Sequence, residues 1–141
     1  MKSLLIRSFL VSMSACVLAG CGHNPDRPAE QSVIVTAANE TAALARLRAV
    51  VQAERRYQVE SGGPYATLDQ LIQKGYLNDP SQGKLSGYRF DVKVRPGGFE
   101  ATAVPEKYGV TGTRSFFVDE LNVVHGANKK GEQATASDPE V

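Results

Sequence analysis

The chain has 141 residues, and its 16 basic and 15 acidic side chains give a formal net charge of +1 at pH 7. Nucleic-acid binding calls for a clustered basic face, and nothing in the sequence indicates one. We therefore expect no nucleic-acid partner. The length suits one small domain with a single hydrophobic core.

The N-terminal 20 residues have the three parts of a secretory signal peptide. Lys2 and Arg7 make the start positive, an apolar run covers about residues 8–18, and small residues precede Cys21. The apolar run has about half of the ~20 residues that a transmembrane helix needs. We expect residues 1–20 to be cleaved rather than kept as an anchor.

The four residues Leu18-Ala19-Gly20-Cys21 resemble the lipobox of bacterial lipoproteins. The resemblance implies that the Cys21 sulfur receives a diacylglyceryl group, and that the amine freed by cleavage is then acylated, for example with palmitate. Two or more acyl chains anchor a protein stably, whereas one is marginal. Gly22 follows where an aspartate commonly retains lipoproteins at the inner membrane. The resemblance therefore implies a lipid-anchored envelope protein at the outer membrane, facing the periplasm.

Cysteine use excludes other thiol chemistry in the mature chain. Of the two cysteines, Cys16 lies in the predicted signal and Cys21 carries the predicted lipid. We expect no disulfide, no thiol catalysis and no cysteine-based metal site.

Composition divides the rest into a tether, a domain and a tail. Residues 21–35 are polar and proline-containing, which predicts a flexible tether of up to ~40 Å. Residues 127–141 have no large apolar side chain before Val141, which predicts a disordered tail. The folded domain is expected over residues 36–126.

The domain is predicted to begin with a helix over about residues 36–59, which ends at the breakers of residues 61–64. Apolar residues recur at helical spacing and form one stripe: Leu44, Leu47, Val50, Val51 and Tyr57.

Glu54 falls within this apolar stripe. Two interpretations are open: a buried acid with a perturbed pKa that marks a functional site, or a structural acid. The structural acid would lie at the edge of the stripe or accept hydrogen bonds from a nearby loop backbone, and we favour it.

A short second helix is predicted over about residues 68–74. Thr67 and Gln70 have the spacing of a capping box, and Gly75 is placed for a left-handed C-terminal cap.

The remainder predicts an antiparallel sheet. Apolar and polar residues alternate over residues 88–95, Pro96-Gly97-Gly98 supplies a turn, and the alternation resumes to Ala103. Further strands are expected over residues 114–118 and 122–125. The fold class is therefore α+β: a long N-terminal helix packed on a small antiparallel sheet of three to four strands that keeps one face in water.

This order of elements resembles the head domains of type IV pilins and type II secretion pseudopilins. The matching stretches are LRAVVQAERRYQ, TLDQLIQKGYL, SGYRFDV and TGTRSFFVDELNVV, within residues 38–125. The resemblance implies a pilin-head-like fold and a structural or protein-interaction role, associated with secretion or pili. One departure is clear: a lipobox and a polar segment stand where pilins have a leader and a long apolar helix. A prepilin peptidase would find no substrate here.

The inventory of chemical groups predicts a protein that is not an enzyme and has no cofactor and no metal site. The two histidines, His23 and His125, are far apart in sequence and have no evident partners. No phosphate-binding glycine loop of a known type is present. Asp119 and Glu120 are side chains that a cation could use, but a solvated hairpin turn is the better interpretation.

The alternative is a small lipoprotein that binds a ligand or glycan. Tyr65, Tyr88 and Tyr108 are expected near loops, where aromatic rings can stack on a sugar. Tyrosine more often packs with its hydroxyl at the surface. The sequence does not identify the ligand-binding residues.

Overall fold

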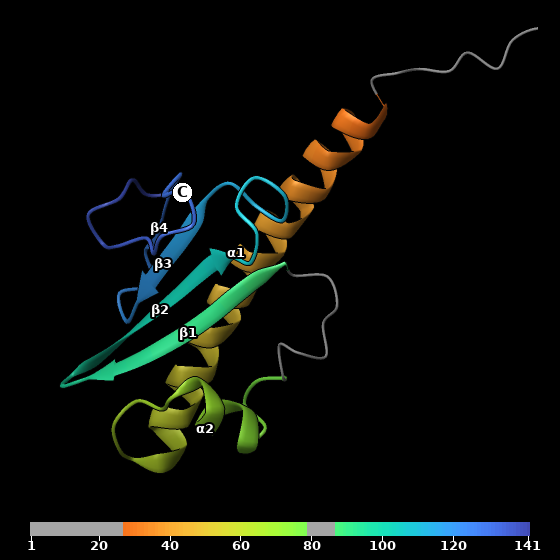
Figure 1. Ribbon diagram of the computed structural model, residues 1–141. Helices are drawn as coiled ribbons and strands as arrows, with labels where there is room; N and C mark the ends of the chain where they lie inside the picture. Colours follow the sequence, from red (N-terminus) through yellow and green to blue (C-terminus); the bar gives the residue numbers. More distant parts are fainter. Residues whose placement is uncertain (1–26, 79–86) are drawn as a thin grey trace, which may run out of the picture.

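The computed structural model describes residues 27–78 and 87–141, so the predicted signal peptide, lipobox and Cys21 lie outside the described residues. Helices α1 (Arg27–Ser61) and α2 (Leu68–Gln73) precede strands β1 (Tyr88–Arg95), β2 (Gly98–Pro105), β3 (Ser115–Asp119) and β4 (Val124–Ala127). The strands form one antiparallel sheet in the order β1-β2-β3-β4 (Figure 1). The predicted α+β class is confirmed.

The core lies between α1 and the inner face of the sheet. Leu47 and Val51 of the predicted apolar stripe are fully buried, and Val50 is 1% exposed. They belong to one hydrophobic cluster with Phe99 of β2 and Phe116 of β3. The helix was expected to cover the apolar side of the sheet, and its contacts with β2 and β3 show that it does.

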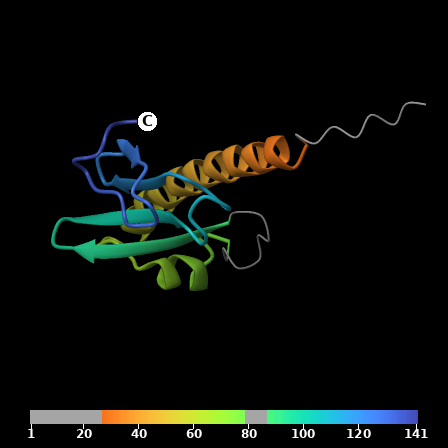
Figure 2. The same cartoon turned by 45° about the horizontal axis from the view of Figure 1, so that its top comes forward.

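Helix α1 begins earlier than the sequence suggested. The tether predicted over residues 21–35 is wrong from Arg27 onward, because the chain is already helical there. Pro28 is compatible with this start, since proline is tolerated in the first turn of a helix. The N-terminal turns of α1 project past the sheet (Figures 1 and 2). Its other end is as predicted: α1 stops at Ser61, and Gly62 follows with a φ of +60°.

The loop between β2 and β3 is fixed to α1 by a buried carboxylate. Glu40 is 8% exposed, and its Oε1 accepts hydrogen bonds from the Thr113 N–H at 3.0 Å and the Thr113 hydroxyl at 2.8 Å. Its two oxygens also accept from the backbone N–H and from Nε of Arg114, at 3.2 and 2.9 Å. Burial alone would raise the pKa of Glu40, but these bonds outweigh burial and lower it.

Helix α2 has the predicted capping box. The Gln70 N–H donates to the Thr67 hydroxyl at 3.3 Å, and the Thr67 N–H donates to the Gln70 side chain at 2.9 Å. Gly75 has a φ of +77°, the left-handed conformation expected at the end of this helix. Local sequence chemistry therefore determines both ends of α2.

Strand β3 departs from the expected pattern of one dry and one wet face. Phe116 and Val118 are fully buried in the core cluster, yet Phe117, whose side chain lies on the opposite face, is only 6% exposed. On the neighbouring strand, Val104 is 3% exposed. The outer face of the sheet is therefore covered near β3. On β1, by contrast, the residues Arg89, Asp91 and Lys93 of the same face are exposed.

The C-terminal segment provides this cover, so the prediction of a disordered tail over residues 127–141 is wrong. Ala134 is 2% exposed. The Gly126 N–H donates to the Pro139 carbonyl at 2.8 Å, and the Val141 N–H donates to the Val124 carbonyl at 3.0 Å. The tail thus folds over the outer face and pairs with β4 at the edge of the sheet.

We expect the substitution Glu40→Ala to lower the free energy of unfolding by about 2–4 kcal/mol, because it leaves partly buried donors of Thr113 and Arg114 without the carboxylate that accepts from them. Chemical denaturation at pH 7 measures this loss. The matched control is Glu106→Ala, which removes an exposed acid and should change stability by less than ~0.5 kcal/mol. Equal effects of the two substitutions would contradict the role given to Glu40.

Candidate functional site

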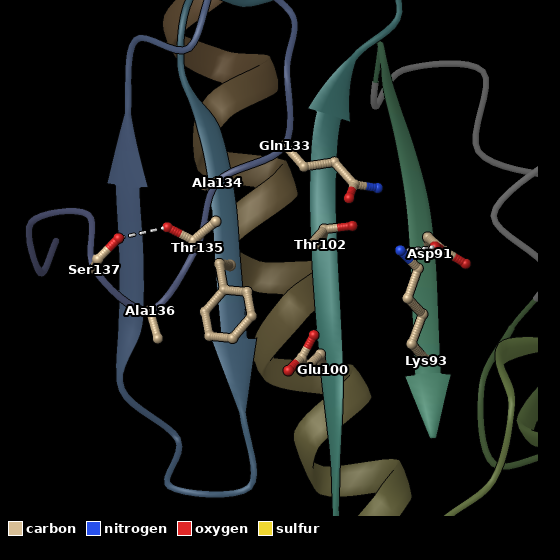
Figure 3. Close-up of a pocket in the computed structure, with 10 residues that line it drawn as sticks. Asp91, Lys93, Glu100, Thr102, Gln133, Ala134, Thr135, Ala136 and Ser137 are labelled. Atoms are coloured by element: carbon tan, nitrogen blue, oxygen red, sulfur yellow. Dashed lines mark hydrogen bonds and ion pairs between the residues drawn. The ribbon is translucent and has the colours of Figure 1, made fainter. Parts of the chain in front are cut away.

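A groove of about 360 Å³ lies on the outer face of the sheet, on the side away from α1 (Figure 3). Its floor comes from Glu100 and Thr102 of β2 and from Phe117 of β3. Asp91 and Lys93 of β1 form one side, and residues 133–137 of the tail form the other. The groove therefore exists because the tail covers the β3 side of the outer face and leaves the β1 side open.

The strand register explains why these side chains lie together. Asp91 pairs with Thr102 and Lys93 pairs with Glu100 across β1 and β2, while Thr102 pairs with Phe117 across β2 and β3. Directly paired residues place their side chains on the same face of a sheet. The floor is thus built by rigid, hydrogen-bonded strands rather than by loops.

The groove holds charges of both signs and uncharged hydrogen-bonding groups. The side chains of Asp91 and Lys93 are 51% and 64% exposed, and their charged atoms are 4.0 Å apart. Glu100 is also partly open to water and lies 3.5 Å from Arg95. Exposed pairs of this kind contribute little to stability. Their carboxylate oxygens therefore remain available to a ligand.

Asp138 holds the tail in place. Its Oδ2 accepts from the Thr135 N–H at 2.8 Å, its Oδ1 accepts from the Lys129 ammonium at 3.1 Å, and its carbonyl lies 2.7 Å from Nδ1 of His125. The Thr135 and Lys129 bonds lower the pKa of the Asp138 carboxyl. The carboxylate is therefore charged at neutral pH and fixes the wall of the groove.

Glu54 is a structural acid. Its side chain is fully buried, Oε2 accepts from the Ala66 N–H at 2.9 Å, and Oε1 is buried without a hydrogen-bond partner among the described residues. Burial raises the pKa of Glu54 to about 6, although the bond from Ala66 lowers it. The favoured interpretation, an acid that accepts from a loop backbone, is confirmed. Glu54 is not part of the groove.

The other residues considered in the sequence do not converge on one site. Cys21 and His23 lie outside the described residues. His125 contacts the tail rather than the groove. In the turn after β3, Asp119 accepts from the Leu121 N–H at 3.0 Å, and Glu120 pairs with Arg95 at 2.9 Å. Asp119 therefore stabilises the turn between β3 and β4, and Glu120 connects that turn to the end of the β1–β2 hairpin.

The three tyrosines considered for sugar stacking lie in different environments. The Tyr65 ring packs 5.1 Å from the Phe99 ring. Tyr88 is 3% exposed, and its hydroxyl donates to the Arg114 carbonyl at 2.7 Å. Tyr108 is 43% exposed. Tyr65 and Tyr88 therefore pack in or against the core, and no tyrosine lines the groove.

Sequence reasoning missed the groove because its wall is the tail that composition marked as disordered. One signal was available: Phe116 and Phe117 are adjacent in a strand, and adjacent strand residues point to opposite faces. Two neighbouring phenylalanines therefore call for cover on both sides of the sheet. With α1 on the inner face, the C-terminal segment is the part of the chain placed to supply the outer cover.

The variant Glu54→Gln should respond differently to pH from the wild-type chain. A folded-state pKa of about 6, against an ordinary value of 4.5, means that the folded protein favours the protonated acid. This contribution to stability is complete below pH 4.5 and is lost as the pH rises through 6. We expect the wild type to lose about 2 kcal/mol relative to the variant between pH 4.5 and pH 8.

Denaturant titrations at several pH values measure this difference. Glu132→Gln, at an exposed acid of the tail, is the matched control and should follow the wild type. A constant stability difference between Glu54→Gln and wild type over this range would show that Glu54 does not titrate as proposed.

Over residues 27–78 and 87–141, no helix is both long and apolar enough to cross a membrane. The same residues contain no group of three or more histidine, cysteine or acidic side chains placed to hold a metal ion. Comparison with known proteins found no matching family model, no matching curated protein and no matching solved structure.

Proposed function

We propose that the chain is a lipid-anchored protein of the cell envelope, attached to the outer membrane through Cys21 and facing the periplasm. Its folded part serves as a non-catalytic, pilin-like domain that contacts other envelope proteins, including components of secretion or pilus systems. The lipobox supports the anchor. The long helix packed through its C-terminal part on an antiparallel sheet supports the pilin-like description.

The main support for an interaction role is the N-terminal part of α1, which projects past the sheet (Figure 1). Val33, Ile34 and Val35 are 68%, 66% and 53% exposed there. β-Branched residues are mediocre helix formers, and a short helical segment without tertiary contacts is marginal in water. Burial of each such side chain against a partner would contribute up to about 1.5–3 kcal/mol. A projecting, apolar helix surface is therefore suited to protein contact.

The early start of α1 also limits how far the domain can lie from its anchor. Between Cys21 and Arg27 an extended chain reaches at most ~20 Å. The exposed valines and Ile34 then lie in the first turns of α1. The proposed contact surface is thus held close to the membrane, where neighbouring envelope proteins are anchored.

Replacing Cys21 by alanine should abolish fatty-acid labelling of the protein in cells and release it from the membrane fraction. Cys16→Ala is the matched control, because it removes the other cysteine from within the predicted signal and should leave labelling intact. Metabolic labelling with an alkyne fatty acid, followed by fractionation, measures both. Undiminished labelling of Cys21→Ala would refute the lipid anchor.

A photo-crosslinking amino acid at Ile34 should form adducts with pilus or secretion subunits of the envelope in living cells. The control position is Val59, which is 83% exposed near the other end of α1 and should give no such adducts. Mass spectrometry of the adducts identifies the partners. Equal adducts from both positions, or none from Ile34, would contradict a partner surface on the projecting helix.

A further inference from the structure

The C-terminal tail does more than cover apolar residues on the outer face of the sheet. To shield Phe117 and Val104, a few apolar residues over β3 would suffice, and Ala134 lies there. The segment also carries Gln133, Thr135 and Ser137 along the edge of the groove. Asp138 fixes this segment through bonds to Thr135 and Lys129. A wall held in one conformation loses little entropy when a ligand binds, which favours affinity.

Two uncharged side chains of the groove lack hydrogen-bond partners among the described residues. These are the hydroxyl of Thr102 on β2 and the amide of Gln133 on the tail, and Gln133 extends over β2 in Figure 3. A hydroxyl and a primary amide each donate and accept hydrogen bonds. They therefore match ligand groups that also donate and accept hydrogen bonds. A hydroxyl group is the simplest group of this kind.

The charged groups favour an uncharged ligand. Asp91 and Glu100 supply carboxylate oxygens, which accept hydrogen bonds from hydroxyl groups, and Lys93 supplies a donor. With two acids and one base, the groove has no positive excess that would hold a phosphate or another anion. The lining thus combines several acceptors and donors with a small negative excess, which suits a neutral ligand with many hydroxyl groups.

The floor adds an apolar component. The ring of Phe117 lies at the base of the groove and remains 6% exposed, and Ala136 of the tail flanks it. The carbon-bound hydrogens of a sugar ring can contact this small apolar area. The volume of about 360 Å³ is within the ~300–1,000 Å³ typical of small-molecule sites.

A peptide is a poorer match to this groove. An extended peptide gains most of its affinity by adding a strand to a free sheet edge. Here the floor strand β2 is already paired on both sides, with β1 and with β3. The backbone N–H and C=O groups of a peptide on this face could form hydrogen bonds only with a few side chains.

We propose that the outer-face groove binds a short neutral saccharide. Thr102, Gln133, Asp91 and Glu100 bind its hydroxyl groups, and the small exposed part of Phe117 contacts one ring. This site does not depend on the proposed envelope role, since it involves neither Cys21 nor the projecting part of α1. The saccharide can be free or part of a wall polymer, because the recognising chemistry is the same.

The test is a titration of the ¹⁵N-labelled chain with cellobiose, with N,N′-diacetylchitobiose and with the tripeptide Ala-Ala-Ala, followed by amide chemical shifts. We expect saturable shifts confined to amides near residues 91–93, 100–102 and 133–137, with one or both disaccharides and a Kd of at most ~10 mM. A second arm measures co-sedimentation with insoluble peptidoglycan, which distinguishes a wall polymer from a free saccharide as the source.

Two variants locate the binding. Thr102→Val and Gln133→Ala each remove an unpaired hydrogen-bonding group and should weaken saccharide binding by about two- to tenfold, while the remaining amide shifts show an intact fold. Gln52→Ala, at an exposed glutamine of α1, is the matched control and should bind like the wild type.

Three results would overturn the proposal: no saturable shift with either disaccharide, shifts with the tripeptide in place of the disaccharides, or unchanged binding in both groove variants. If disaccharides bind but peptidoglycan does not, the proposal stands with a free saccharide as ligand.

Discussion

Strand β3 has apolar side chains on both of its faces, and the remaining elements are arranged to cover them. Phe116 and Val118 face α1, whereas Phe117 faces the opposite side. Burial of a phenylalanine side chain contributes roughly 1.5–3 kcal/mol, a large fraction of the stability of a small domain. The sheet therefore needs two covers. Helix α1 provides the inner one, and the C-terminal segment provides the outer one with small and polar residues held by Asp138.

Two buried glutamates connect α1 to the loops, and their surroundings give them opposite properties. Glu40 accepts from several donors of Thr113 and Arg114, so its pKa is lowered and it is charged at neutral pH. Glu54 has one donor, the Ala66 N–H, so burial dominates and its pKa is raised. The same residue type on one helix thus gives a permanent ion or a titratable acid, according to the number of donors that surround it.

Features that depend on neighbouring residues were predictable from the sequence. The capping box of Thr67 and Gln70, the left-handed Gly75 and the hairpin of β1 and β2 each follow from the chemistry of a few adjacent positions. The last two strands were also foreseen, each displaced by one or two residues.

The errors have two physical causes. Residues 27–35 belong to the polar, proline-containing segment that suggested a tether, yet they extend α1, because a helix that already exists grows by adding one hydrogen bond per residue. In the C-terminal tail, distant contacts override composition. Residues 127–141 have few apolar groups, but Asp138 and backbone pairing with β4 fix them. The groove was missed for the same reason, since half of its lining is in this tail. Composition measures how much surface a segment can bury, and not how many hydrogen bonds it forms with the rest of the fold.

The pairing of the tail with β4 also affects how copies of this protein behave toward one another. An open strand edge is a template for association with other chains, and it is a common route to aggregation. On β4 that edge is occupied by the chain's own C-terminal residues 139–141. At the other side of the sheet, β1 carries the exposed charges of Arg89, Asp91 and Lys93. A charged strand on one side and a self-capped strand on the other both discourage edge-to-edge association of the sheet with another copy.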